Sequence, residues 1–310
     1  MLGRISAIAM NTYREAVRAR VLLVLLGMAL ATSLYSLVIA AMSVRQEMRI
    51  VADIGSSSIS LYAVFVTVVL GATSLHRELQ LKTIFPILTR RLRRHEYILG
   101  KYFGIFATLL AFVALDAASV LAIMAVQSKQ HVPLTLGVAG GLLVVLIALL
   151  VHAKHTRVFV VLPWSAALFL AMALLADGAG GERQLVVASA LLTLAEVAIV
   201  GAITMMFSSF SSPGLTAAFT AWLFLIGRSA DTMANIPERI FGATVRDAGK
   251  VLAHVVPNLN LYVPARPLLL GELAAAPLWG YVGRAWLIAI FYAAILLTVS
   301  ALIFRRRDFQ

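Results

Sequence analysis

Eight long apolar runs recur along the chain, and they restrict its fold more than any other feature. They cover residues 21–42, 58–75, 100–126, 134–151, 158–176, 185–207, 214–227 and 285–304. A helix of about 20 apolar residues crosses the roughly 30 Å hydrocarbon core of a bilayer. Hydrophobic residues make up 61% of the chain and charged residues only 13%, against about 25% charged residues in soluble domains. The sequence therefore predicts an all-α, polytopic membrane bundle of about eight transmembrane helices, built as a single domain over residues 1–310.

The first 20 residues precede the first apolar run and have a different pattern. One face of a helix over this segment gathers the apolar side chains Ile5, Ile8, Ala9, Ala16 and Val17. The opposite face gathers Arg4, Asn11, Arg14, Glu15 and Arg18. An amphipathic helix of this kind lies along the membrane surface, so we expect an interfacial helix over residues 1–20.

The positive charge is concentrated in alternate connecting segments. Residues 1–20, 77–101, 154–157 and 305–307 hold most of the 26 Lys and Arg residues. Because these residues favour cytoplasmic loops, we predict a multi-pass protein of the cell (inner) membrane with both termini in the cytoplasm. This placement accounts for most of the formal net charge of +12, and nucleic acid is therefore not an expected partner.

The longest segment on the predicted outer side covers residues 229–283. Apolar residues recur there at helical spacing up to Val255, and Pro257, Pro264 and Pro267 then interrupt the pattern. We expect one or two amphipathic helices resting on the outer interface, followed by irregular chain.

Motifs for enzymatic chemistry are missing from the sequence. The pair Gly100-Lys101 is followed by Tyr102, whereas a phosphate-binding loop needs Ser or Thr at that position. The chain has no cysteine, and no catalytic, cofactor-binding or metal site is expected. We therefore predict that the chain is not an enzyme and has no nucleotide-binding loop of its own.

Two acidic residues, Asp116 and Glu196, fall within predicted spans. A charged side chain at a helix centre costs about 2.5–3.5 kcal/mol on insertion scales, so both are expected to face the bundle interior. They either form part of a translocation path or proton relay, or hydrogen-bond to Ser, Thr or backbone groups and so hold helices together. No Lys, Arg or His within a predicted span is placed to complete an obvious relay.

The segment "RELQLKTIFPILTRRLRRHEYILGKYFG" resembles the cytoplasmic loop of type-2 ATP-binding-cassette export permeases. The residues that carry the resemblance are Arg77, Glu78, Thr83, Leu88, Arg94, Glu96, Gly100 and Lys101. Three further stretches, in the family's order, support it: "TYREAVRARVLLVLL", "MMFSSFSSPGLTAAFTAWLFLIG" and "PNLNLY". The chain departs from the family at Lys82 and Arg91, and by an additional span pair at residues 134–176.

The resemblance implies a permease subunit of an ATP-driven export complex. Residues 76–100 would form a cytoplasmic coupling loop, whose part at 77–98 docks a separate ATPase dimer that binds the ATP. The docking residues would be Arg77, Glu78, Leu81, Thr83, Phe85, Arg90, Arg91, Arg93 and Arg94. A second permease copy would complete a homodimer. The four arginines are also open to a simpler interpretation, in which they mark a cytoplasmic loop and touch anionic membrane lipid.

Two other functions remain open at this stage. One is a proton-coupled secondary transporter that uses Asp116 and Glu196. The other is a membrane anchor that relays the motion of an ATPase to a periplasmic protein through residues 229–283.

Overall fold

The computed structural model describes residues 2–43, 46–80, 93–152, 157–235, 256–270 and 277–306. These residues form helices and no strands, and seven of their helices are long and apolar enough to cross a membrane. The seven are α2 (Arg20–Ala41), α3 (Glu47–Gln80), α5 (Arg94–Gln127), α6 (Val132–His152), α7 (Arg157–Leu175), α8 (Gly181–Ser208) and α14 (Leu278–Arg306). The chain is a polytopic helical membrane protein, as the apolar runs predict.

The run at residues 214–227 does not form a complete span. It becomes α9 (Pro213–Arg228), a helix of 16 residues that would reach about 24 Å at 1.5 Å per residue, short of the roughly 30 Å needed. After α9 the described chain continues through α10 (Ala230–Ala234), the short helix η2 (Leu259–Tyr262) and α13 (Arg266–Leu269). The prediction of eight spans is therefore one too many within the described residues.

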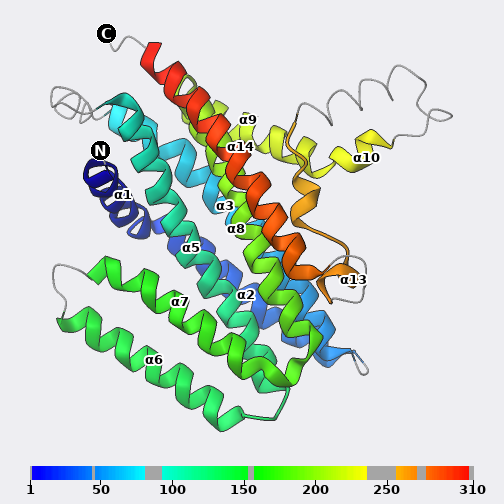
Figure 1. Ribbon diagram of the computed structural model, residues 1–310. Helices are drawn as coiled ribbons and strands as arrows, with labels where there is room; N and C mark the ends of the chain where they lie inside the picture. Colours follow the sequence, from blue (N-terminus) through cyan, green and yellow to red (C-terminus); the bar gives the residue numbers. More distant parts are fainter. Residues whose placement is uncertain are drawn as a thin grey trace.

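Both ends of the chain lie at the same end of the bundle (Figure 1). The guanidinium of Arg94, the first residue of α5, donates to the carbonyl oxygens of Phe304 and Arg305 near the end of α14. Arg4 lies beside Glu96 of α5. We call this end, marked by Arg4, Arg94 and Arg305, the termini end. Helix α9 starts there and α14 starts at the opposite end, and the described residues between α9 and α14 form only short helices.

Helices α3, α5 and α8 form the core. More of their apolar length is buried than in the other spans, and small residues let them approach closely. A Cβ atom at Gly55 of α3 would lie 2.5 Å from a Val120 methyl carbon of α5, and one at Gly71 would lie 2.6 Å from a Thr204 methyl carbon of α8. Helix α3 is thus held between its two neighbours along much of its length.

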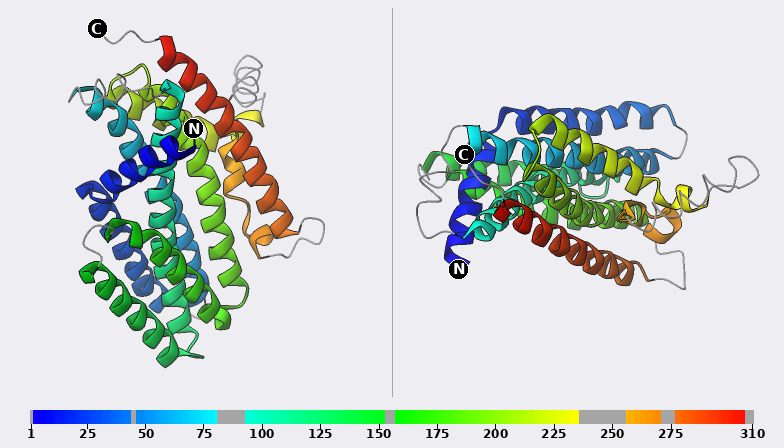
Figure 2. Two further views of the ribbon diagram at one scale, coloured as in Figure 1. Left: turned by 60° about the vertical axis from the view of Figure 1, so that its left-hand side comes forward. Right: turned by 90° about the horizontal axis from the view of Figure 1, so that it is seen from above.

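Helix α1 (Leu2–Val17) is separate from α2 and crosses α5 near the termini end (Figure 2). The crossing depends on Gly100 and Gly104. A Cβ atom at Gly104 would lie 2.5 Å from the carbonyl oxygen of Ala9, and one at Gly100 would lie 2.6 Å from Ile8. The GxxxG spacing at these positions therefore packs α1 on α5 within one chain.

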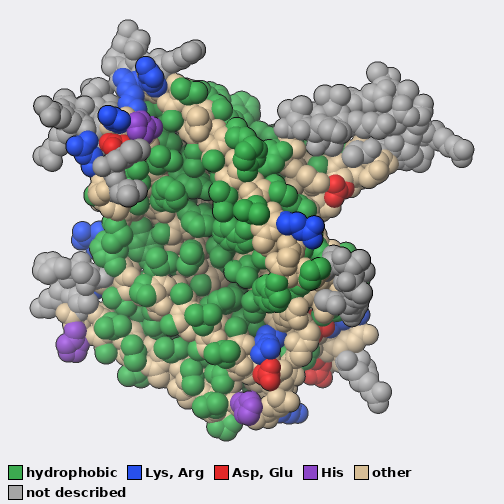
Figure 3. Space-filling model, in the orientation of Figure 1, with side chains coloured by type: hydrophobic (Ala, Val, Ile, Leu, Met, Phe, Trp, Pro, Cys, Tyr) green, Lys and Arg blue, Asp and Glu red, His purple; other side chains and the backbone are tan. Residues whose placement is uncertain are grey.

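The additional pair, α6 and α7, lies at the edge of the bundle, with α6 outermost (Figure 1). Few of its residues are buried. The indole nitrogen of Trp164 in α7 donates to the carbonyl oxygen of Leu142 in α6, at 2.7 Å. On the face shown in Figure 3, hydrophobic side chains cover most of the central part of the molecule. This is the surface that the acyl chains of a bilayer would cover.

Candidate functional site

Four of the nine predicted docking residues are described, and they lie at the termini end, at the end of α3 and the start of α5. Arg77 and Glu78 belong to the last turn of α3, Arg93 immediately precedes α5, and Arg94 is its first residue. The residues between these helices, Leu81, Thr83, Phe85, Arg90 and Arg91, lie outside the described residues. The two helices that flank this segment are both 34 residues long.

The side chain of Arg94 contacts the end of α14. Its Nη1 atom lies 3.1 Å from the carbonyl oxygen of Phe304 and 2.9 Å from that of Arg305. The last carbonyls of a helix have no partner within the helix, and a cation placed there satisfies them and favours the negative end of the helix dipole. Tyr97, one turn further along α5, stacks on Phe304 with ring centroids 6.1 Å apart. Arg94 and Tyr97 thus join the start of α5 to the end of α14.

The side chain of Glu96 joins the same part of α5 to α1. It is almost fully buried, and its Oε2 atom accepts a hydrogen bond from the backbone N–H of Arg93 at 3.1 Å. The same oxygen lies 3.8 Å from Nη1 of Arg4 in α1. A carboxylate in the first turn of a helix also favours the positive end of the helix dipole. Glu96 therefore caps α5 and holds α1 against it.

Lys101 is a completely buried cation, with an exposed fraction of 0%. Its Nζ atom donates to the hydroxyl of Ser74 in α3 at 3.2 Å and lies 4.0 Å from Oε2 of Glu15 in α1. It also lies 6.0 Å from the centre of the Tyr97 ring. Burying a charge is costly unless it is paired, so these contacts account for its position. We call Glu15, Ser74 and Lys101 the Lys101 network.

A second polar cluster lies deep within the bundle and consists of Ser60 of α3, Glu196 of α8 and Arg228 of α9. Arg228 Nη2 donates to the Ser60 hydroxyl at 2.8 Å, and that hydroxyl donates to Glu196 Oε2 at 3.1 Å. Arg228 Nε lies 3.5 Å from Glu196 Oε1. Glu196 is completely buried and lies near the middle of α8. The expectation of no suitable basic residue concerned only those within predicted spans, and Arg228, which directly follows the predicted span at residues 214–227, lies beside Glu196.

The end of α9 consequently lies at the level of the middle of α8. At 1.5 Å per residue, the part of α8 between Glu196 and Ser208 is about 18 Å long. Within the described residues, Glu196 Oε1 and Arg228 Nη1 are buried and have no hydrogen-bond partner. One is an acceptor and the other a donor, so a water molecule or a hydroxyl group of a ligand could satisfy both.

Asp116 has a different environment. It is completely buried in α5, and the hydroxyl of Ser33 in α2 lies 3.5 Å from its Oδ1 atom. Its Oδ2 atom has no hydrogen-bond partner within the described residues. The two predicted intramembrane acids therefore contact different helices, α2 for Asp116 and α3 and α9 for Glu196.

The part of the predicted outer segment that the structure describes packs into the bundle. Asp231 of α10 accepts hydrogen bonds from the side-chain amides of Asn258 and Asn260, each at 2.7 Å. The Tyr281 hydroxyl of α14 donates to the carbonyl oxygen of Leu261 at 2.5 Å. Leu259 is completely buried and lies against Gly227, where a Cβ atom would be 2.9 Å from Leu259 Cγ. The "PNLNLY" stretch thus packs against α9, α10 and α14.

Residues 278–283, which the sequence placed in that outer segment, form the first turns of α14. Residues 236–255, where we expected amphipathic helices, lie outside the described residues. Near the start of α13, Arg266 pairs with Asp53 of α3 and Glu182 of α8. This pairing fixes α13 to two core helices at the opposite end of the bundle.

The chain matches no protein-family model and no curated protein sequence. Within the residues that the structure describes, no group of three or more His, Cys, Asp or Glu side chains could hold a metal ion. The functional interpretation therefore depends on the two polar clusters and on the helices that carry them.

Proposed function

We propose that the chain is the membrane-spanning permease subunit of an ATP-driven export complex, docked to a separate cytoplasmic ATPase through residues 77–98. The observation that carries the proposal is the way the helices on either side of this segment are joined to the rest of the bundle. Within its first eight residues α5 contacts α1, α3 and α14, through Glu96, Lys101 and Arg94 respectively.

The length of the flanking helices supports docking at this segment. At 1.5 Å per residue, the 34 residues of α3 and of α5 reach about 51 Å each, well beyond the roughly 30 Å hydrocarbon core. The segment that connects them can therefore be held at or beyond the head-group region, where a soluble subunit can reach it.

The contacts of α5 also suggest how motion would be transmitted. A force on the 77–98 segment would act directly on the start of α5, and the Lys101 network would carry α1 and α3 with it. Arg94 and Tyr97 would carry the end of α14. Packed helices joined in this way move as rigid bodies, so ATP binding and hydrolysis in the docked subunit would reposition several helices together.

The proposal also includes the orientation and the partners expected from the sequence. The termini end would face the cytoplasm, with both termini there, and the complex would lie in the cell (inner) membrane. A second permease copy would pair with the first, and each copy would dock one ATPase of a dimer. The cluster of Ser60, Glu196 and Arg228 would then lie at mid-membrane depth, where the open donor and acceptor could contact a polar group of the cargo.

Reversing charge in the docking segment tests the proposal. The tagged full-length chain with Arg90→Glu and Arg91→Glu is purified from native membranes, and co-purifying proteins with a phosphate-binding loop are quantified. We expect about a tenfold loss of the ATPase, because truncating or reversing interfacial charges costs more than about 1.4 kcal/mol. The matched control is Arg14→Glu with Arg18→Glu, two exposed arginines at the same end. Undiminished ATPase recovery from the docking variant would overturn the proposal.

A second variant separates docking from transmission. Lys101→Met removes the buried charge but keeps the length and volume of the side chain. We expect the ATPase to co-purify normally while its stimulation by the permease, and transport, are lost. Loss of both docking and stimulation would show that Lys101 only maintains the fold.

A proton-coupled secondary transporter is the second candidate, favoured by the pairing of the buried Glu196 with the partly buried Arg228. It predicts transport that continues after ATP depletion, is driven by an imposed pH gradient and is abolished by Glu196→Gln. The ATP-driven complex predicts the reverse: transport stops when ATP is depleted and ignores the pH gradient.

A further inference from the structure

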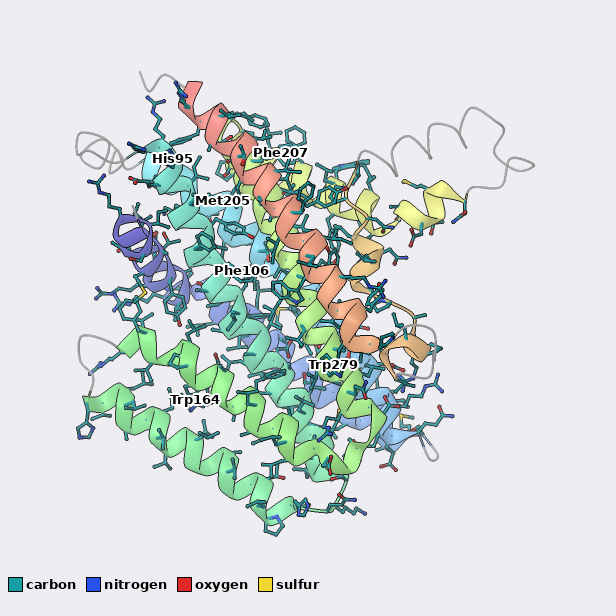
Figure 4. The ribbon with its side chains drawn as sticks, viewed as in Figure 1. His95, Phe106, Trp164, Met205, Phe207 and Trp279 are labelled. Carbon is teal, nitrogen blue, oxygen red and sulfur yellow. The ribbon has the colours of Figure 1, made fainter. Side chains whose placement is uncertain are left out.

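Helices α5 and α14 touch at two levels and separate between them. At the termini end, Arg94 donates to the carbonyl oxygens of Phe304 and Arg305, and Tyr97 stacks on Phe304. Deeper in the bundle, the rings of Phe106 and Trp286 meet edge to face, with centroids 6.5 Å apart. Figure 4 shows α5, labelled at His95 and Phe106, beside α14. The space between the two contacts forms a groove that is closed at each end.

Side chains of contrasting size form the groove. Helix α14 contributes the small residues Ala293, Ala294, Thr298 and Ala301 beside the larger Trp286, Ile290 and Leu297, and Ala198 of α8 also lines the groove. Helix α5 contributes large apolar side chains, of which Phe103 is about half exposed. The cavity has a volume of about 500 Å³, within the range of sites that bind small molecules. Its exposed rim lies on the apolar surface of the bundle, where lipid is the surrounding medium.

The length and width of the groove restrict what can enter it. From His95 to Phe106, α5 rises about 16 Å at 1.5 Å per residue, close to the roughly 15 Å that one leaflet contributes to the hydrocarbon core. A helix with its side chains is about 10 Å across, and the contacts at both ends would prevent one from lying along the groove. A single acyl chain meets both limits, whereas a helix of a second copy does not.

The charge at the termini end indicates which head group the bound lipid carries. His95 lines the groove at this end, and Arg305, at the end of α14, is exposed. Arg94, which donates to the carbonyl oxygen of Arg305, adds a second positive charge at this end. Figure 3 shows basic and histidine side chains gathered at this end, beyond the apolar surface. Basic residues between helices at a membrane face favour anionic head groups.

We propose that the groove between α5 and α14 binds one acyl chain of an anionic phospholipid, with the phosphate of its head group beside His95 and Arg305. The lipid fills the space between the two contacts and joins the helices along one leaflet. This assignment is independent of the transport proposal, because it depends only on the shape and charge of the groove.

Lipid retention tests the proposal. The full-length chain is reconstituted in nanodiscs of equal parts phosphatidylglycerol and phosphatidylethanolamine, extracted into mild detergent and analysed by native mass spectrometry. We expect one phosphatidylglycerol per chain, favoured about fivefold over phosphatidylethanolamine, as about 1 kcal/mol per basic residue implies. Equal retention of the two lipids by the unmodified chain would overturn the head-group assignment.

Filling the groove tests the position of the acyl chain. Ala294→Phe places a ring in the groove and should abolish lipid retention, and Ala301→Leu serves as a second variant if the first does not fold. The control is Ile295→Phe, at an exposed neighbouring position of α14 that does not line the groove. Unchanged retention in folded groove variants would overturn the proposal, as would a change in oligomeric state with lipid retention intact.

A last pair of variants tests the head-group contact alone. Arg305→Gln should keep the bound lipid but reduce the preference for phosphatidylglycerol by about threefold to fivefold. Arg14→Gln, which removes an exposed arginine elsewhere at the same end, should leave the preference unchanged. Equal effects of the two variants would mean that the net charge of the surface, rather than the groove, selects the lipid.

Discussion

The guanidinium of Arg228, at the end of α9, lies 3.5 Å from the carboxylate of Glu196, in the middle of α8. Ser60 of α3 hydrogen-bonds to both side chains. Three helices therefore share one polar contact inside an apolar bundle. Because the side chain of Glu196 has no exposed surface, its charge depends on these partners for stabilisation.

Removing one member of this pair should cost more than removing both. Truncating one partner of a buried ion pair costs about 3–5 kcal/mol, because the other charge is left uncompensated, whereas replacing the pair with apolar groups is often neutral. We expect Arg228→Met to lower the free energy of unfolding by about 3 kcal/mol and Arg228→Met with Glu196→Leu to recover most of it. Reversible unfolding in detergent measures both.

The control for that comparison is Arg284→Met. Arg284 is an exposed arginine of α14, so its replacement should change the free energy of unfolding by less than about 1 kcal/mol. If Arg228→Met behaved like Arg284→Met, the pair would contribute nothing to stability.

Replacing Lys101 with methionine should cost little stability, unlike Arg228→Met, although we expect it to abolish ATPase stimulation and transport. Its neighbours Glu15 and Ser74 are partly exposed, so they can be solvated when the ammonium is removed. We expect Lys101→Met to change the free energy of unfolding by less than about 1 kcal/mol, because a buried charge is replaced by an apolar group of similar volume. Lys101→Ala should cost about 2–5 kcal/mol, since it leaves a cavity. Thermal unfolding of the two variants distinguishes the charge from the volume.

The crossing of α1 over α5 should be sensitive to a single methyl group. At Gly104 a Cβ atom would lie 2.5 Å from the carbonyl oxygen of Ala9, and backbone cannot move aside as a side-chain end can. Gly104→Ala should therefore cost about 1–3 kcal/mol and increase cleavage of α1 by added protease. At Gly137 of α6 no atom lies within 4 Å of the added Cβ, so Gly137→Ala should be neutral or stabilising by helix propensity. Equal effects would exclude the crossing as the cause.

Asp231 should hold the "PNLNLY" stretch in place. Its two hydrogen bonds from Asn258 and Asn260 are exposed, so each contributes at the low end of about 0.5–1.5 kcal/mol. Asp231→Ala should raise hydrogen exchange across residues 256–262 by about fivefold to tenfold. Asp177→Ala, which removes an exposed acid paired with Arg183, should leave exchange in that stretch unchanged. Unaltered exchange in Asp231→Ala would mean that Tyr281 and Leu259 alone hold the stretch.

Most of the fold could be predicted because crossing a bilayer imposes a length. The run at residues 21–42 became α2, Arg20–Ala41, and the run at 134–151 became α6, Val132–His152. The run at residues 214–227 has 14 residues, too few for a helix that crosses the hydrocarbon core. The prediction erred there because counting runs assumes that each one completes a span.

The contacts between helices could not be predicted in the same way. Arg228 follows an apolar run directly, so its position in the sequence suggests an interfacial residue. Its pairing with Glu196 arises only because α9 ends at mid-depth, and this depends on how α9 packs against α8. Likewise, Lys101 begins an apolar run like many interfacial cations, and its burial depends on α1 crossing over Gly100 and Gly104.

The incomplete span has a consequence for how the chain is assembled during synthesis. Helix α8 is synthesised before α9, so the carboxylate of Glu196 is already in the membrane when Arg228 is inserted. The free-energy cost of inserting the arginine is therefore reduced. The "PNLNLY" stretch forms its contacts later still, because Leu261 contacts Tyr281 and Tyr262 contacts the carbonyl of Ala285, and both partners belong to α14. The described residues 256–262 therefore reach their final position only when α14, which follows them in the chain, has been inserted.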